Sequence, residues 1–547
     1  MKISPKELHA LLLSETEHTL VDVREIDPFS QNHLLFAIPL PLGRLELLIA
    51  DLIPRKSVPI VICDETNAEG LAERAARRLH ELGFNDVAIL DGGITAWREA
   101  GFETYSGVNV PSKAFGEFIE HEEATPSLSA EEVQNLMADG SDILILDSRP
   151  FSEFNWASIP TGLCCSGAEL VYRAFSTVPS PETKVIVNCA GRTRSIIGAQ
   201  SLINAGLPNK VYALRNGIMG WRLSGYEPAT GAKGWAPTPE KVDQLAAHNA
   251  AVQVAERFNV QPISLQALSQ WQQERDDKSL FVLDVRTIDE FEVGHLADAV
   301  HAPGGQVIQA TDEYIGVRNA RIVLVDNDGT RATMTASWLL QMGHSHVRTL
   351  AMEDNPELTT VVGPRHKPIV RPENLEVATI DPRSAKALVD DGALILDMSL
   401  SPKYREGHIP GAWFVLRSQI KASVTSIAQN ATSEFERAPA LILTSEEGSL
   451  AKLGLSELST LAGKPVHALE GGNTAWQNAG FQLTNSEQKY SVDPIDIWRN
   501  KDKGETVEDA MRAYLDWEVD LMVQLGRDGS TRFQHFPKSH PLQNPSL

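Results

Sequence analysis

Residues 185–206, VIVNCAGRTRSIIGAQSLINAG, place one cysteine between an apolar β-branched run and a helix-like pattern. The cysteine is Cys189, and two arginines, Arg192 and Arg194, follow it closely. Only the thiolate form of cysteine is a good nucleophile, and guanidinium groups and the N–H groups at a helix start both stabilise it. We therefore predict that Cys189 is a nucleophile with a lowered pKa and that a helix begins near Ser195.

The loop that starts at this cysteine also has the composition of an anion-binding site. Residues 189–195 contain two arginines and no acidic side chain, although the 547-residue chain has a net charge of −23. We predict that Arg192 points outward at the rim and selects the charged end of a substrate, whereas Arg194 braces the loop. The full predicted substrate-binding set is Ala190, Gly191, Arg192, Thr193, Arg194 and Ser195.

A fourfold repeat places this loop at the end of a strand. Apolar runs that end in aspartate recur as LVDVRE, LILDSRP, FVLDVRT and LILDMSL, and a second apolar run follows each of them. The residues at the ends of the second runs are Asp64, Cys189, Asp326 and Ser445, and the first three follow their aspartate by 42 residues. An amphipathic stretch comes next in every repeat. This order predicts parallel sheets with helices on both faces and sites at the carboxyl ends of strands.

Three of the repeats end in a glycine–tryptophan element. It reads LDGGITAWREAGF, LRNGIMGWRLSGY and LEGGNTAWQNAGF, so that Gly93, Gly217 and Gly472 each precede a tryptophan by four residues. The third repeat has LAMEDNPELTTVVGP instead. Composition and repeats together predict four α/β modules, called first to fourth here, and a helical C-terminal tail: 1–109, 124–232, 259–366, 371–484 and 485–547.

The tail contains one amphipathic helix by its pattern. Its apolar stripe consists of Val507, Ala510, Met511, Tyr514, Leu515, Leu521, Met522 and Leu525. We predict that Gly526 ends this helix and that the stripe docks on the core of its own chain, with a homodimer contact as the alternative.

The loop CAGRTRS, the DVR and DSR openings, the segments EFEVGHLADA and YREGHIPGA, and the closing element together resemble the rhodanese (sulfurtransferase) superfamily over residues 1–484. The resemblance implies a small α/β sheet domain in each module. It also implies a cysteine that takes a sulfane sulfur from a donor such as thiosulfate and passes it to cyanide or a thiol, with no metal or organic cofactor. The second module departs from the family pattern at one place, because Ser158 stands where a histidine is usual.

The resemblance makes the second module the catalytic one. Asp64, Asp326 and Ser445 occupy the cysteine position in the first, third and fourth modules, and their seven-residue loops carry charges of −3, −1 and −2. Acidic loops repel an anionic donor. We expect these three modules to be inactive.

Other functions stay open at this point. Cell-cycle phosphatases share this fold with a C-x5-R loop, and a phosphatase or arsenate reductase is the weaker alternative because Cys189 and Arg194 form C-x4-R. A second alternative is a noncatalytic scaffold or redox sensor, in which Cys164 or Cys165 forms a disulfide with Cys189. Simple packing is the interpretation we favour for Cys164 and Cys165, and also for Cys63.

The overall composition limits the classes of partner that the protein can bind. The negative charge argues against nucleic-acid and anionic membrane surfaces. No apolar run is long enough to span a bilayer, and the four cysteines lack the CxxC spacing of a metal site. We therefore expect a cytoplasmic protein whose partners are a small sulfur donor and a thiol or cyanide acceptor.

Overall fold

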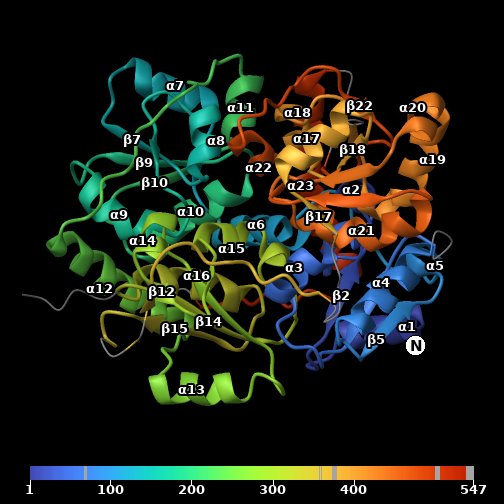
Figure 1. Cartoon of the computed structure of the whole chain (residues 1–547). Coiled ribbons are helices and arrows are strands. Elements are labelled where there is room, and N and C mark those ends of the chain that lie inside the picture. Colours follow the sequence, from blue (N-terminus) through green and yellow to red (C-terminus); the bar gives the residue numbers. More distant parts are fainter. Residues whose placement is uncertain (67–69, 356–357, 359, 372–377, 499–505, 538–547) are drawn as a thin grey trace, which may run out of the picture.

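The computed structural model describes residues 1–66, 70–355, 358, 360–371, 378–498 and 506–537. These residues form four parallel sheets in chain order, one in each predicted module, with helices around them (Figure 1). The predicted α/β class, with several small parallel sheets and a helical C-terminal region, is confirmed.

The first two modules have five-stranded parallel sheets with the same strand arrangement. The orders are β1-β5-β4-β2-β3 and β6-β10-β9-β7-β8. The strands are β1 (Lys2–Ile3), β2 (Thr19–Asp22), β3 (Ala37–Pro39), β4 (Ile60–Cys63), β5 (Val87–Leu90), β6 (Ser127–Leu128), β7 (Ile143–Asp147), β8 (Leu163–Cys164), β9 (Lys184–Asn188) and β10 (Val211–Leu214). Their central strands are apolar runs buried on both faces, as expected when helices cover both sides of a parallel sheet.

Helices connect these strands and cover both faces. In the first module they are α1 (Pro5–Leu12), α2 (Ile26–Gln31), η1 (Leu42–Arg44), α3 (Leu45–Leu52), α4 (Leu71–Glu81) and α5 (Gly93–Glu99). In the second they are α7 (Ala130–Ala138), α8 (Phe151–Trp156), α9 (Glu169–Thr177), α10 (Thr193–Asn204) and α11 (Gly217–Leu223). The segments between modules are helical as well: α6 (Val110–Glu123) precedes the second module and α12 (Lys241–Phe258) follows it.

The third module has a smaller sheet, of order β13-β11-β14-β15, beside an antiparallel pair of β12 with β16. Its strands are β11 (Leu280–Asp284), β12 (His295–Leu296), β13 (Val300–His301), β14 (Arg321–Asp326), β15 (Val347–Ala351) and β16 (Thr360–Val361). Its helices are α13 (Leu265–Gln273), α14 (Ile288–Val293), α15 (Gly304–Gln309), η2 (Thr311–Glu313) and α16 (Thr330–Gln341). The strand that begins the other three sheets is reduced here to one isolated bridge, between Pro262 and Thr349.

The fourth sheet has six strands, in the order β17-β21-β20-β18-β19-β22. They are β17 (Thr379–Ile380), β18 (Leu394–Asp397), β19 (Trp413–Phe414), β20 (Leu441–Thr444), β21 (Val466–Leu469) and β22 (Lys489–Tyr490). The helices are α17 (Pro382–Asp390), α18 (Ser401–Glu406), η3 (Arg417–Gln419), α19 (Ile420–Asn430), α20 (Thr432–Arg437), α21 (Ser449–Ala462) and α22 (Gly472–Asn478). Because β22 pairs with β19, the first residues of the predicted tail belong to this sheet instead.

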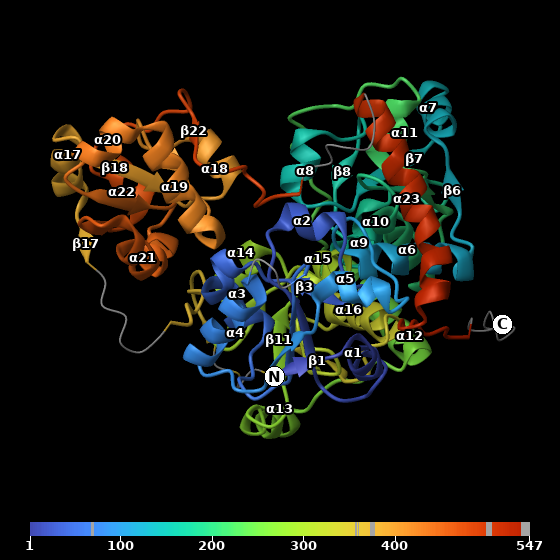
Figure 2. The ribbon, with the colours of Figure 1, turned by 90° about the vertical axis from the view of Figure 1, so that its right-hand side faces the viewer.

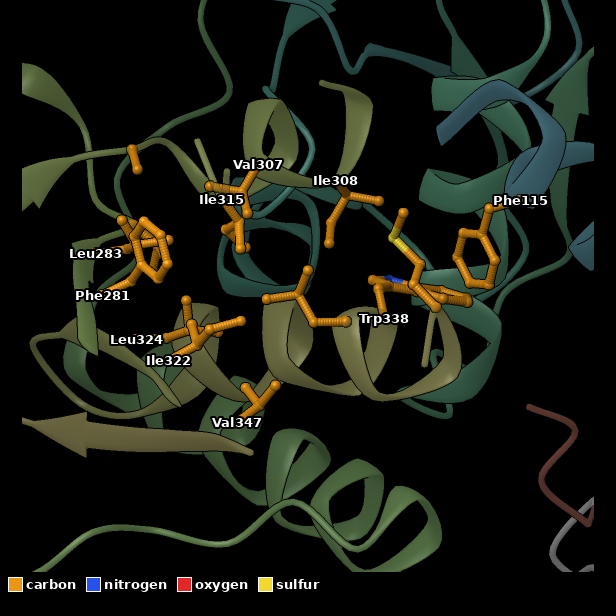
Figure 3. Packing of buried hydrophobic residues seen from close by; sticks show 14 of the residues in the cluster. Phe115, Phe281, Leu283, Val307, Ile308, Ile315, Ile322, Leu324, Trp338 and Val347 are labelled. Carbon is orange, nitrogen blue, oxygen red and sulfur yellow. The ribbon is translucent and has the colours of Figure 1, made fainter. Parts of the chain in front are cut away.

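The first three modules share one large hydrophobic cluster, in addition to a smaller cluster within each of them. A single cluster of buried residues runs from Val21 in the first module to Val347 in the third, and α6 and α12 contribute to it. Figure 3 shows part of this cluster, where Phe115 of α6 lies edge-on to Trp338 of α16 with ring centroids 6.1 Å apart. The fourth module has two core clusters of its own, and Figure 2 shows it set apart from the other three.

The tail forms α23 (Val507–Asp528), which lies along α6 and contacts α11 (Figure 2). Tyr514, Leu515, Leu521 and Leu525 are buried, and the last two pack with residues of the first module and α6. Docking on the chain's own core is therefore confirmed. The predicted end is wrong, because the helix continues through Gly526 and ends at Gly529, which has the left-handed conformation that glycine readily adopts.

Among the described residues, no helix combines the length and the apolar character that crossing a membrane requires.

Candidate active site

Cys189 directly follows β9, between β7 and β10 at the middle of the second sheet. Helix α10 begins at Thr193, two residues before the predicted start. The Cys189 thiol lies 3.5 Å from Ser195 Oγ, and that hydroxyl donates to the Arg192 carbonyl at 2.8 Å. The cysteine is only 1% exposed. The loop is thus closed on itself around a buried sulfur.

Several backbone N–H groups of this loop are not used in hydrogen bonds within the described structure. Within the part of the chain that the structure describes, the N–H groups of residues 191–194 have no hydrogen-bond acceptor. The N–H groups at a helix start are available for anions when no cap uses them. This loop therefore offers hydrogen-bond donors to a negatively charged sulfur or oxygen atom.

The matching loops of the other modules use their N–H groups internally. In the third module, Asp326 Oδ1 accepts from Gly329 N at 2.7 Å, and Oδ2 accepts from Arg331 N at 2.8 Å and Ala332 N at 3.1 Å. In the first, Asp64 Oδ2 accepts from Ala72 N at 3.0 Å, and in the fourth Ser445 Oγ accepts from Ala451 N at 3.4 Å. In the third module, a carboxylate thus binds the N–H groups of Gly329 and Arg331, which match the unused N–H groups of Arg192 and Arg194.

The closing element holds the loop from behind. Ile218 N donates to the Cys189 carbonyl at 2.9 Å, and Gly217 has a φ of 51°. A Cβ on Gly217 would collide with the same carbonyl, so a glycine is required there. The repeated glycine–tryptophan pattern is explained by this contact, because Ile94 and Asn473 donate in the same way to Asp64 and Ser445. In the third module, which lacks the element, Met352 N donates to the Asp326 carbonyl.

Arg192 does not point outward as predicted. Its Nε and Nη2 donate to both carboxylate oxygens of Glu117 at 2.7 Å, Nη2 also contacts Glu120, and Nη1 donates to Asn216 at 3.2 Å. Glu117 and Glu120 lie on α6, between the predicted bounds of the first and second modules. In this structure the guanidinium fastens the loop to α6, and its charge is neutralised there.

Arg194 has the geometry of a brace. It makes a two-pronged ion pair with Glu153 of α8, with N···O distances of 2.7 and 2.8 Å. In the third module, Arg331 pairs with Glu290 in the same way and also binds Glu169. Because the arrangement recurs beside a residue that is not a nucleophile, it serves the loop's shape in both modules.

The Asp–Arg pair at the end of β7 belongs to the scaffold. Arg149 binds Asp147 through Nε and Nη2, and Asn188 donates to the same carboxylate. Glu153, four residues after Arg149, binds Arg194 instead. Ser158 keeps the main-chain geometry of the histidine-bearing modules: it forms an antiparallel bridge with Ala229, as His408 does with Thr484.

The pKa of the Cys189 thiol is raised, which corrects the prediction of a lowered value. Burial is the main cause, and the charge of Glu518 acts in the same direction. The Arg194 guanidinium and hydrogen bonds from Ser195 lower the pKa but do not offset the burial. Arg194 and Ser195, the groups that lower the pKa, are recognisable in the sequence, but nothing in the sequence indicates that other segments cover the loop.

The cover comes from α6 and α23, and the sequence analysis missed its polar members. Tyr514 Oη donates to Glu518 Oε1 at 2.9 Å, Lys113 Nζ donates to Tyr514 Oη at 2.6 Å, and all three side chains are buried. Tyr514 was predicted only as part of an apolar stripe. No local pattern marks Lys113 or Glu518, because each acquires its role only when distant segments meet.

Cys164 and Cys165 are buried, reduced cysteines with raised thiol pKa values, about 12 for Cys164, chiefly because of burial. Cys164 and Asn188 lie on opposite sides of Asp147 in the sheet, two strand spacings or about 9–10 Å apart. Disulfides need Cα atoms within about 7 Å of each other. A disulfide from Cys189, which directly follows Asn188, to Cys164 would therefore require the backbone to move.

Within the described residues, no group of three histidine, cysteine, aspartate or glutamate side chains could hold a metal ion. What the second module offers is a sulfur nucleophile at the carboxyl end of a central strand, next to unused N–H groups.

The chain thus repeats one α/β module four times, and only the second module has a cysteine directly after its central strand. This combination defines the class of protein. The model of the rhodanese-like domain matches residues 4–100, 129–224, 265–352 and 381–479, and the chain belongs to the rhodanese family. It is similar over nearly its whole length to the thiosulfate sulfurtransferase of Pseudomonas aeruginosa. The crystal structure of that protein matches with a TM-score of 0.92 and 45% identity, and covers 98% of this chain and 99% of its own.

Shorter relatives match a part of the chain. The thiosulfate sulfurtransferase GlpE of Pseudomonas savastanoi pv. phaseolicola is 33% identical over 100 residues, which are 18% of this chain and 86% of that protein. An uncharacterized protein of Synechocystis is 33% identical over 109 residues, 20% of this chain. The chain spans 58% of the length of that relative.

Proposed function

We propose that the protein is a sulfurtransferase that moves a sulfane sulfur from thiosulfate or a similar donor to cyanide or a thiol through a persulfide on Cys189. The observation that carries this proposal is the contrast between the second and third loops. The N–H groups that bind a carboxylate at Asp326 have no acceptor beside Cys189. They are suited to stabilise the negative outer sulfur of a persulfide.

The reaction would take two steps. The Cys189 thiolate attacks the outer sulfur of thiosulfate; the new S–S bond forms as the old one breaks, and sulfite leaves with the electron pair of the old bond. In the second step, cyanide attacks the outer sulfur of the persulfide, thiocyanate leaves, and the thiolate returns. With a thiolate acceptor the product is a new persulfide. Charge is conserved in each step, and no external oxidant or reductant is needed.

The test is intact mass spectrometry of the full chain. Incubation with thiosulfate should add one sulfur atom, cyanide should remove it, and Cys189→Ser should not gain it. Cys63→Ser is the matched control, because Cys63 is equally buried and lies at the end of β4 in the first module. A sulfur that is retained in Cys189→Ser would overturn the proposal. A protein that gains no sulfur from any sulfane donor, but forms a disulfide with peroxide, would favour the redox-sensor alternative.

A further inference from the structure

The C-terminal helix α23 brings a carboxylate directly over the loop that carries Cys189. A Cβ placed on Gly191 would lie 3.2 Å from Glu518 Oε2, 3.4 Å from Tyr514 Cε1 and 3.8 Å from Leu515 Cδ2. Thr193 Oγ1 lies 3.5 Å from Glu518 Oε1. Glu518 therefore faces two of the loop residues that present unused N–H groups.

Half of the Glu518 carboxylate has no partner. Oε1 accepts from Tyr514 and lies 3.5 Å from Lys113 Nζ. Oε2 has no hydrogen-bond partner among the described residues, although Glu518 is only 1% exposed. A buried, unpaired carboxylate oxygen is costly for folding, so a group of this kind usually has a function.

The positive groups around Cys189 do have partners. Arg192 is neutralised by Glu117 and Glu120, and Arg194 by Glu153. Lys113 lies between Tyr514 and Glu518. The arginines alone gave the isolated loop a positive charge, but the folded site adds four carboxylates and one lysine to it. Lys113 and Glu518 form an ion pair, and the three cations and four carboxylates together leave a net charge of −1 at the site.

We propose that Glu518 is a specificity-determining residue of this site, which disfavours donors with two negative charges and favours persulfide donors and thiols with little or no charge. The inference rests on the proposed sulfur transfer at Cys189 and narrows its donor class. Glu518 Oε2 is placed to accept a hydrogen bond from the S–H group of such a partner. Thiosulfate, which carries two charges, would react slowly in comparison.

Two alkylating reagents of similar shape test the charge around Cys189 without any transfer of sulfur. Iodoacetamide is neutral and iodoacetate is an anion, and both modify the same thiol. In the wild-type chain, the ratio of the two rates at Cys189 should favour iodoacetamide about tenfold more than it does for a free cysteine. If the arginines dominated, the ratio would shift toward iodoacetate. A ratio equal to or below that of free cysteine would overturn the inference, and this measurement needs no variant.

Variants extend the test to sulfur transfer. Glu518→Gln keeps the shape and removes the charge, so it should raise kcat/KM for thiosulfate relative to the singly charged donor benzenethiosulfonate by about tenfold. Glu518→Asp keeps the charge and should keep most of the discrimination. Asp516→Asn is the matched control, because it removes one charge from an exposed position on the same helix and should leave the ratio unchanged.

The outcomes separate the two proposals. If the protein gains no sulfur from either donor, the proposed function fails, whatever the alkylation ratio is. If sulfur is transferred but Glu518→Gln changes both donors equally, Glu518 has only a structural role and the inference fails alone. A merely structural role would also leave the pH dependence of Cys189 alkylation unchanged, whereas loss of the Glu518 charge should move it to lower pH.

Discussion

The loop after β14 in the third module is built like the loop after β9 in the second, but the Asp326 carboxylate binds the N–H groups of its own loop. Both loops begin a helix, and both hold an arginine in a two-pronged pair with a glutamate 41 residues earlier. In one the N–H groups bind Asp326, and in the other they have no acceptor. The third module therefore has the same backbone arrangement of N–H donors as the second.

This comparison shows how a module without the cysteine can remain well folded. An empty ring of N–H groups in a buried loop is unfavourable unless a ligand, water or side chain fills it. Replacement of the nucleophile by aspartate removes the chemistry and at the same time satisfies those donors. The third module lacks the cysteine at the same position at which its aspartate binds the backbone N–H groups.

The largest expected effect comes from transferring this feature to the catalytic loop. Cys189→Asp should reduce turnover of thiosulfate and cyanide by about 10³-fold or more, because the nucleophile is lost. Its carboxylate should bind the N–H groups of the loop, so the variant should melt no lower than Cys189→Ser. Calorimetry of the two inactive variants checks this. A clearly lower melting temperature for Cys189→Asp would show that the second loop cannot adopt the arrangement of the third.

The next effect concerns the pH dependence of stability. Burial raises the pKa of Asp326 to about 6, above the value of about 3.9 expected in the unfolded chain. Between these values the folded state holds a proton that the unfolded state has released. The stability that this group contributes is therefore fully present below about pH 4 and is lost as the pH rises to 6, by about 3 kcal/mol.

Urea unfolding between pH 4 and 7 measures this change. The free energy of unfolding of the wild type, relative to Asp326→Asn, should fall across that window. Asp312, whose pKa burial also raises to about 6, is present in both proteins, and its contribution cancels in the difference. Parallel curves for the two proteins would contradict the role given to Asp326.

The smallest effect separates the two bracing arginines. Arg194→Gln removes a charge that lowers the Cys189 pKa, so alkylation by iodoacetamide at pH 8 should slow by about tenfold for each unit that the pKa rises. Arg331→Gln is the equivalent change in the third module. It should leave that rate unchanged, although it removes the ion-pair partner of Glu290 and one of the two ion-pair partners of Glu169. Equal slowing in both variants would mean that Arg194 acts only through the fold.

Local features of this molecule could be predicted well from the sequence. The apolar runs before Asp64, Cys189 and Asp326 fixed the strands, and the constant spacing fixed the repeat. Comparison of one repeat with the next showed that only the second has a cysteine at this position, and it also predicted the bracing role of Arg194. Each of these inferences depends on residues that are close in sequence or equivalent by repetition.

The electrostatics of the site could not be predicted in this way. The sign of the charge around Cys189 depends on Glu117 and Glu120 from α6, Glu153 from α8 and Glu518 from α23. None of them lies in the loop whose charge was counted. The raised thiol pKa has the same origin, because burial by the tail is a property of the assembled chain. Arg192 was predicted to be a free cation for this reason.

The position of α23, which follows the third and fourth modules in the sequence, has a consequence for biosynthesis. Domains tend to fold in the order in which they leave the ribosome, so the second module can form its sheet long before Glu518 is translated. During that interval Cys189 lacks its cover, and the burial that suppresses its ionisation is incomplete. The nascent chain would therefore pass through a stage in which this sulfur is more open to oxidants than in the finished protein.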